Sequence, residues 1–173
     1  MTDESTQELG TQRDDAPDPR LAELIGPLLA GVAEADRPVV IAMAERIAAD
    51  RYRAWAEQVG DPVDKARLMA CAAREDEIAS KVEAIVADAE AIQAKVLSAH
   101  PDIAAGYKAL FAGLSLAEQF SFQARAERAG AAVWRSTAAA LSVGDRPIYL
   151  ECAEFEEASA EILEALIAEG LET

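Results

Sequence analysis

The chain is short of several residue types on which common enzyme sites depend. It has one histidine, His100, and two cysteines, and aromatic residues make up only 5% of its 173 residues. The sequence contains no glycine-rich phosphate loop, no Cys-x-x-Cys pair and no recognisable set of serine, histidine and aspartate. It therefore gives no support for a hydrolase or for a nucleotide-binding protein.

Basic residues are also scarce beside acidic ones. Lys and Arg number 16 against 32 Asp and Glu, which gives a formal net charge of −16 and a sequence pI of about 4.4. A surface of this charge repels nucleic-acid phosphates and anionic lipid headgroups. We therefore expect no nucleic-acid partner and no membrane partner, although a well-solvated acidic surface would by itself explain the same composition.

Long apolar runs are missing as well. No run reaches the roughly 18 residues that a membrane-spanning helix needs. The sequence shows no charged-then-apolar leader, and two cysteines are too few for a disulfide framework. These features predict a cytoplasmic protein.

The residues that are abundant favour helices. Hydrophobic residues make up 51% of the chain, alanine dominates them, and Glu, Leu and Arg are also strong helix formers. No stretch shows the polar–apolar alternation typical of strands, so the sequence predicts an all-α fold. Residues 1–17 are acidic and poor in apolar side chains, which predicts a disordered acidic tail before a single helical-bundle domain at 18–173.

Cap and turn signals divide this domain into helices. Asp18-Pro19 begins an accessory N-terminal helix, which Gly26-Pro27 should kink or split. Four main helices are expected at roughly 37–59, 62–97, 116–141 and 146–169, and Ser115 and Glu118 form a capping box at the third. Short turns within each pair predict antiparallel neighbours, and a short linking helix within 101–114 fits a crossover between the pairs.

The second half of the domain echoes the first. Glu75 corresponds to Glu156 within similar stretches 81 residues apart, and Glu45 corresponds to Glu127 within Ala-Glu-Arg triplets 82 residues apart. An internal repeat of this length predicts that an antiparallel helix pair has been duplicated.

Four glutamates differ from the many other acidic residues. Side chains at i±3 and i±4 are neighbours on a helix, and these neighbours include no basic residue at Glu45, Glu75, Glu127 and Glu156. Glu77, by contrast, has Arg74 and Lys81 within reach and belongs to a solvated face. Four buried carboxylates need compensation, because desolvating each charge costs several kcal/mol. They must bind cations, pair with other helices, take up protons or lie nearer the surface, and cation binding best explains their number and symmetry.

A duplicated helix pair gives four helices, and each carries one of these glutamates. In this respect residues 37–169 resemble the ferritin-like superfamily. The resemblance implies a four-helix bundle with a dinuclear iron or manganese site, whose ligands would include Glu45 and Glu127. Glu75 and Glu156 would take the place of the Glu-x-x-His glutamates. Ile78 and Ser159 stand at the two histidine positions, which leaves an all-oxygen site suited to hard cations such as Mn²⁺, Fe²⁺ or Ca²⁺.

The resemblance further implies a metal-binding oxidoreductase that reacts with O₂ or peroxide, or that oxidises Fe²⁺. The residues alone leave two alternatives open. The metal site could be vestigial, or the protein could belong to a different functional class. In that alternative, a metal-free helical bundle acts as a protein-interaction or oligomerisation module. A homodimer would then form through the N-terminal helix and the long second main helix.

Two tyrosines and both cysteines lie near the candidate glutamates in the helical pattern. Tyr52 and Tyr149 are each seven residues from a candidate glutamate, where each is a redox-active phenol or a core aromatic whose hydroxyl bonds a neighbour. Cys71 and Cys152 occupy equivalent repeat positions and form either a redox pair or two small buried thiols, of which we expect the thiols. Both tryptophans are expected in the core.

Overall fold

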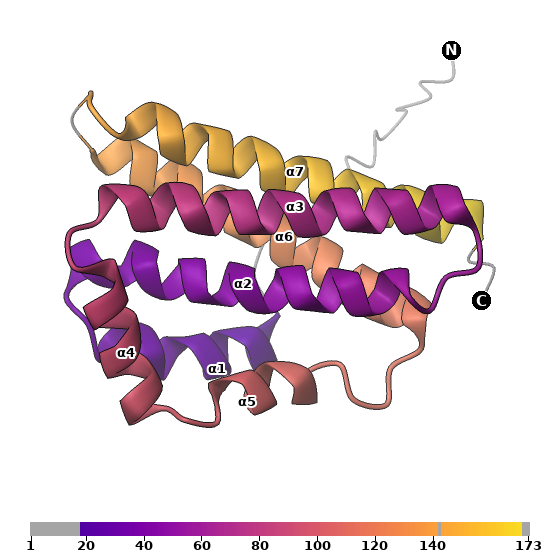
Figure 1. Cartoon of the computed structure of the whole chain (residues 1–173), viewed down its shortest axis with the longest axis horizontal. Helices are drawn as coiled ribbons and strands as arrows, with labels where there is room; N and C mark the ends of the chain where they lie inside the picture. The colour runs from indigo at the N-terminus through magenta and orange to yellow at the C-terminus, as the bar shows by residue number, and fades with distance from the viewer. Residues whose placement is uncertain (1–17, 142, 171–173) are drawn as a thin grey trace, which may run out of the picture.

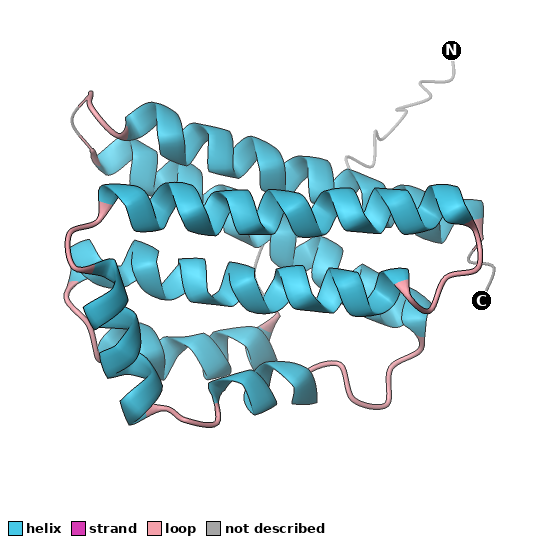
Figure 2. Ribbon diagram, in the orientation of Figure 1, coloured by secondary structure: helices cyan, strands magenta, loops and turns pink. Residues whose placement is uncertain are grey.

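The computed structural model describes residues 18–141 and 143–170, and in this part of the chain every regular element is helical (Figure 2). The all-α prediction is confirmed for these residues, whereas the acidic tail expected at 1–17 lies outside them. None of the described helices is long and apolar enough to cross a membrane. In chain order the elements are α1 (Pro19–Ala30), a 3₁₀ turn (Glu34–Asp36), α2 (Arg37–Ala56), α3 (Pro62–Ile85), α4 (Ala89–Ala99), α5 (Ile103–Ala109), α6 (Leu116–Ala140) and α7 (Arg146–Glu169).

The four long helices α2, α3, α6 and α7 lie side by side (Figure 1). Helices α2 and α3 pack as one antiparallel pair, α6 and α7 pack as another, and α3 also packs against α7. The connection from α3 to α6 runs through α4 and α5 and crosses from one end of the molecule to the other. Helix α1 packs beside α5 and α2.

Side-chain caps fix where several of these helices begin. The carboxylate of Asp61 accepts a hydrogen bond of 2.6 Å from the backbone N–H of Val63 at the start of α3. At the start of α6, Ser115 and Glu118 form the predicted capping box, in which each side chain accepts from the other residue's backbone N–H. These bonds satisfy donors that the first turn of a helix otherwise leaves free.

The prediction of one helix over 62–97 is wrong. Helix α3 ends at Ile85 and α4 begins at Ala89, because Asp88 has a φ of +58°, in the left-handed region. Helix α4 then packs against α2, where Val96 is buried beside Val40 and Met43. No proline or glycine marks this break, so packing rather than local sequence determines it. Part of the apolar surface assigned to a homodimer is thus covered within the chain, and the homodimer stays a prediction.

The first helix is not split. Gly26-Pro27 was expected to kink or split it, and α1 is one helix from Pro19 to Ala30 with Pro27 inside it, so of the two alternatives only the kink stays a prediction. Its apolar side chains pack with α2, α4 and α5 in a cluster that contains Leu28, Val40 and Tyr107. Helix α5 approaches α1 so closely that a Cβ atom on Gly106 would lie 2.7 Å from Leu24 Cδ1.

Two larger apolar clusters fill the space between the four long helices. One contains Trp55 and Phe120 near the α2–α3 turn, and the other contains Trp134 and Val82 toward the opposite end. On each long helix the candidate glutamate falls between residues of one cluster and residues of the other. The fold therefore places four carboxyl groups in a layer between two apolar clusters.

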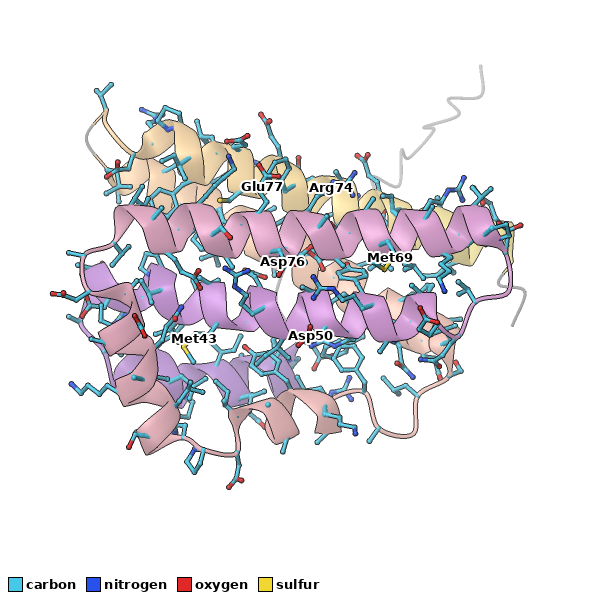
Figure 3. All side chains as sticks on the ribbon, in the orientation of Figure 1. Met43, Asp50, Met69, Arg74, Asp76 and Glu77 are labelled. Atoms are coloured by element: carbon cyan, nitrogen blue, oxygen red, sulfur yellow. The ribbon has the colours of Figure 1, made fainter. Side chains whose placement is uncertain are left out.

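Three consecutive acidic residues of α3 differ sharply in their burial and in their ion pairs. Glu75 is fully buried, whereas Glu77 is exposed. Asp76 lies between α3 and α2, where its carboxylate pairs with Arg46 at 3.1 Å and with Arg53 (Figure 3). Glu77 pairs with Lys81 on its own helix at 3.3 Å, so among these three described residues only Glu75, which turns toward the core, forms no ion pair.

The capping box gives a direct test of how α6 is stabilised. Replacing Ser115 with alanine should lower the free energy of unfolding by about 1 kcal/mol, because the N–H of Glu118 loses its acceptor. Urea unfolding followed by circular dichroism measures this change. The exposed helical residue Ser98 is the control, since Ser98→Ala should raise stability by up to about 0.5 kcal/mol through helix propensity. Equal effects of the two substitutions would contradict the capping role.

Candidate functional site

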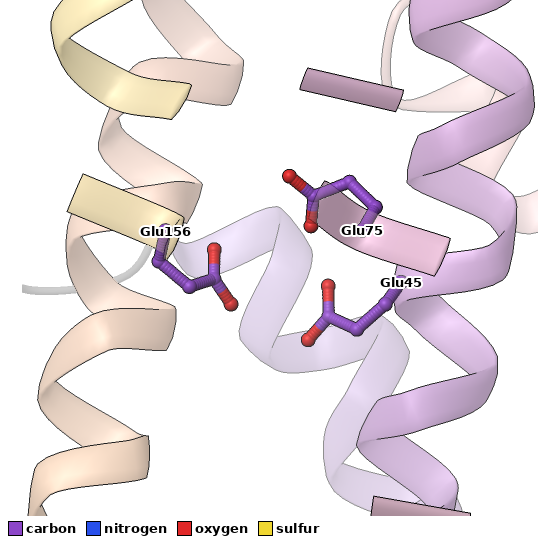
Figure 4. Close-up of side chains that lie close together, drawn as sticks. All are labelled: Glu45, Glu75 and Glu156. Atoms are coloured by element: carbon purple, nitrogen blue, oxygen red, sulfur yellow. The ribbon is translucent and has the colours of Figure 1, made fainter. Parts of the chain in front are cut away.

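The four glutamates singled out in the sequence are all buried in the layer between the apolar clusters. Glu45 is 8% exposed, Glu75 is fully buried, Glu127 is 1% exposed and Glu156 is 2% exposed. One carboxylate oxygen from each of Glu45, Glu75 and Glu156 lies within 4.8 Å of the other two (Figure 4). The structure thus brings together three of the four predicted residues, from α2, α3 and α7.

Glu127 reaches the same layer from α6 but lies outside that closest group of three. Its Oε1 atom accepts two hydrogen bonds, at 2.6 Å from the Tyr52 hydroxyl and at 2.6 Å from Gln123 Nε2. Tyr52 is therefore a buried aromatic whose hydroxyl bonds a neighbour, one of the two alternatives open in the sequence. We call Glu45, Glu75, Glu127 and Glu156 together the carboxylate cluster.

Two further side chains hold the cluster in place. Ser159 Oγ donates to Glu75 Oε1 at 3.0 Å, and Trp134 Nε1 donates to Glu156 Oε1 at 3.0 Å. Ser159 stands where the resemblance would place a histidine, and it positions a carboxylate from the opposite pair of helices. From the sequence Trp134 was expected only to lie in the core, and Gln123 was given no role. The one signal for Gln123 was its place one turn before Glu127, while nothing in the pattern marked the indole of Trp134.

Two fully buried oxygens of the cluster have no hydrogen-bond partner. Glu75 Oε2 and Glu127 Oε2 are buried and unpaired, although the other oxygen of each carboxylate is bonded. A buried polar atom without a partner costs about 1–3 kcal/mol, and more when it carries charge. Such atoms are rare in folded proteins and call for an explanation.

The nearby basic side chains do not neutralise the cluster. Arg51 is half-buried, and its guanidinium donates to Gln123 Oε1 and lies 4.1 Å from the ring centroid of Phe111. The positive charge of Arg51 favours ionised Glu45, and that of Arg74 favours ionised Glu75. Among the described residues, neither arginine forms an ion pair with a carboxylate of the cluster. Two arginines near four carboxylates leave excess negative charge in any fully ionised state.

Burial and mutual repulsion favour the protonated forms of these carboxyl groups. Burial raises the pKa of Glu45 to about 8, and the nearby charge of Glu127 adds to the effect. Burial likewise raises the pKa of Glu75 and of Glu156 well above the ordinary range, with neighbouring carboxylates contributing. Without another cation, the cluster therefore holds protons at neutral pH.

Gly130 allows Glu156 to occupy its position. A Cβ atom at residue 130 would lie 2.6 Å from Glu156 Oε1, closer than real Cβ contacts come. The absence of a side chain on α6 thus makes room for a carboxylate from α7. The helical pattern of the sequence gave no sign of this role for Gly130.

A cavity of about 580 Å³ reaches the cluster from the surface. It lies between α1, α2, α5 and α6, and its lining is apolar apart from a few residues, which include Glu45, Glu127, Glu156, Arg51 and Gln123. Gly26 and Val133 are exposed members of the lining, whereas the three glutamates are buried. Because residues far apart in the chain build this cavity, the helical pattern alone did not reveal it.

The two cysteines take no direct part in the cluster. Both are free and buried, with Cys71 in the apolar cluster around Trp55 and Cys152 in the one around Trp134. Burial raises the pKa of each thiol to about 12, so both are protonated and unreactive at neutral pH. These positions support the interpretation of two small buried thiols.

Comparisons of the chain with models of known protein families, with characterised proteins and with solved structures found no match.

In the presence of a chelator, the free energy of unfolding should fall as the pH rises from about 5 to about 8. Glu45 keeps its proton up to about pH 8 in the folded chain but loses it near 4.5 when unfolded. The contribution of protonated Glu45 to the free energy of unfolding is therefore fully present below pH 4.5 and is lost as the pH rises through 8. Each such group lowers the free energy of unfolding by up to about 1.4 kcal/mol per pH unit in this window.

Urea unfolding at several pH values measures this slope. Glu45→Gln should flatten it, because the amide does not titrate. Glu154→Gln, at an exposed position on α7, is the matched control and should leave the slope unchanged. A parent whose stability rises through this pH window would show that the carboxyl groups are not held protonated by burial.

Gly130→Ala should lower the free energy of unfolding by roughly 1–3 kcal/mol, because the new methyl group displaces the Glu156 carboxylate. Gly26→Ala provides the matched helical control. A Cβ at residue 26 meets nothing within 4 Å, so that substitution should stabilise α1 by up to about 1 kcal/mol. Thermal unfolding of both variants gives the comparison, and a neutral Gly130→Ala would contradict the tight contact.

Proposed function

We propose that this chain is a ferritin-like four-helix bundle whose carboxylate cluster holds a dinuclear metal centre. Two observations support the bundle: α2 with α3 and α6 with α7 form antiparallel pairs, and the sequence echo relates one pair to the other. Each of the four helices contributes one buried glutamate at the same level of the core. A duplicated helix pair with a crossover is the arrangement in which such centres are built.

The observation that carries the metal proposal is the set of four buried carboxyl groups with two unpaired oxygens. Glu75 Oε2 and Glu127 Oε2 have no hydrogen-bond donor, and no basic side chain among the described residues forms an ion pair with the cluster. Divalent cations would supply both the missing positive charge and partners for these oxygens. The donor set therefore fits a bound metal, and deprotonation of the carboxyl groups would accompany binding.

The chemistry of the donors indicates which metals the cluster would hold. All the candidate ligand atoms are carboxylate oxygens, because Ile78 and Ser159 stand at the histidine positions of the resemblance. An all-oxygen site favours hard cations, and among these we propose iron as Fe²⁺ or manganese as Mn²⁺, the metals that the resemblance implies. When bound, such a centre supplies redox chemistry with O₂ or peroxide, or the oxidation of Fe²⁺.

The chain's own residues would position the ligands and protect them. Tyr52 and Gln123 fix Glu127, Trp134 fixes Glu156, and Ser159 fixes Glu75, each through a hydrogen bond to one oxygen. These bonds leave the other oxygens of the carboxylates available to a cation. The apolar clusters on either side of the layer exclude water, which strengthens every electrostatic interaction within it.

The alternative, a metal-free interaction module, finds no specific support in the structure. An interaction module would not account for the two buried oxygens that lack a hydrogen-bond partner. It would also not explain why four glutamates, rather than apolar residues, lie in the middle of the core. Buried ionisable groups with strongly raised pKa values are more typical of functional sites.

Metal analysis after anaerobic loading with Fe²⁺ or Mn²⁺ tests the proposal. The parent should retain up to about two ions per chain after gel filtration, as a dinuclear centre requires. A quadruple Glu→Gln variant of the carboxylate cluster should retain none. The matched control is the quadruple Glu→Gln variant at the exposed residues Glu23, Glu77, Glu90 and Glu154, which should bind like the parent.

Circular dichroism of both variants confirms that they are folded before their metal content is compared. A folded parent that retains neither metal would refute the proposal. Equal loss of metal from the two quadruple variants would show that binding depends on overall charge and not on the cluster.

A further inference from the structure

We propose that the cavity beside the carboxylate cluster binds a fatty acid, with the carboxylate of the ligand at Arg51 and its chain along α2. The inference rests on the proposed metal centre and names the class of organic molecule that would reach it. It is argued from the shape of the cavity, from the position of Arg51 and from the balance of charge.

The lining of the cavity suits an alkyl chain. Its lining on α2 follows one helix face from Ile41 to Arg51, a rise of roughly 15 Å at 1.5 Å per residue. On the opposite side, α1 presents Leu21, Ile25 and Leu29, which repeat every four residues and face the same space. A volume of about 580 Å³ with apolar walls lies within the range of small-molecule sites.

Only one basic side chain is among the described residues that line this cavity, and it is Arg51. Its guanidinium lies 4.1 Å from the ring centroid of Phe111 and 5.9 Å from that of Trp55, and it donates to Gln123 Oε1. These contacts hold the planar group in one orientation beside Phe111. A fixed guanidinium is well suited to a carboxylate, which it binds through two parallel hydrogen bonds.

The balance of charge favours an anionic ligand. Two divalent cations would neutralise the four carboxylates of the cluster, and Arg51 would then remain as a half-buried positive charge without an ion pair. An unpaired charge in a poorly solvated site is costly, and one carboxylate from the ligand would neutralise it. A cationic amphiphile would add to the positive charge and is disfavoured.

The same geometry places the middle of the bound chain at the cluster. Glu45 lies between Ile41 and Arg51 on the lining face of α2, and Glu127 and Glu156 also border the cavity. A ligand anchored at Arg51 would therefore run past the carboxylate cluster rather than end at it. Its hydrocarbon chain, and not its carboxylate, would lie beside the metal centre.

Calorimetric titration of the Mn²⁺-loaded chain with dodecanoate tests the inference. We expect one molecule to bind per chain, and dodecanol and dodecylammonium, which share the tail, to bind at least about tenfold more weakly. Arg51→Met should weaken dodecanoate binding by a similar factor while leaving dodecanol binding nearly unchanged. Metal content is measured on the same samples, so that failure of the metal centre is seen separately.

Variants that fill the cavity test its location. Ala126→Phe should weaken dodecanoate binding by roughly tenfold or more, because Ala126 is a half-buried member of the lining. Ile25→Phe narrows the channel from the side of α1 and serves if the first variant does not fold. Ala139→Phe, at an exposed position of α6 outside the lining, is the matched control and should bind like the parent.

Two results would overturn the inference. The first is a Mn²⁺-loaded parent that does not bind dodecanoate, which would leave the proposed metal centre intact. The second is tighter binding of dodecylammonium, or unchanged dodecanoate binding by Arg51→Met, since either contradicts the assignment of the headgroup. A parent that takes up no metal yet binds dodecanoate would refute the metal centre and the charge balance built on it, while supporting the assignment of the cavity.

Discussion

The burial of four carboxyl groups in one layer of the core is the constraint on which the rest of this structure depends. An apolar core of helices needs no such layer, and each ionised carboxylate placed there without a partner costs several kcal/mol. The surrounding side chains respond to that cost. Tyr52, Gln123, Trp134 and Ser159 each donate to one oxygen, and Gly130 leaves space for another. Two fully buried oxygens still lack a partner, and an excess of negative charge remains, which protons or metal ions must balance.

The apolar clusters, the outer helices and the crossover connection are all arranged around this layer of carboxyl groups. The two apolar clusters on either side of the layer hold the helices in the register that brings Glu45, Glu75 and Glu156 together. The elements outside the four long helices, α1 and α5, close a cavity over the same carboxylates. In the account proposed here, the crossover connection therefore does more than join two helix pairs. It builds one wall of the route by which an apolar molecule would approach the metal centre, and it supplies Phe111, on which Arg51 rests.

Much of this arrangement could be predicted from the sequence, because it depends on local patterns. Helix periodicity and cap residues predicted the four long helices, and the absence of basic neighbours on the same helix selected all four buried glutamates. The break at Asp88 could not be predicted, because no proline or glycine marks it and the packing of Val96 determines where α4 lies. The roles of Gly130, Trp134 and Ser159 were likewise hidden. Each acts on a carboxylate from another helix, and such contacts depend on how the helices pack rather than on spacing along one of them.

The central claim is that metal ions replace protons on the buried carboxylates. Proton release during titration with Mn²⁺ at pH 7 tests it most directly, and calorimetry in buffers of different ionisation enthalpy measures that release. Since burial raises the pKa of Glu45 to about 8 and the pKa of Glu75 and Glu156 well above the ordinary range, binding should release at least about one proton per chain. The number released should fall as the pH is raised above 8. Tight binding of Mn²⁺ without proton release, or no binding at all, would contradict the account.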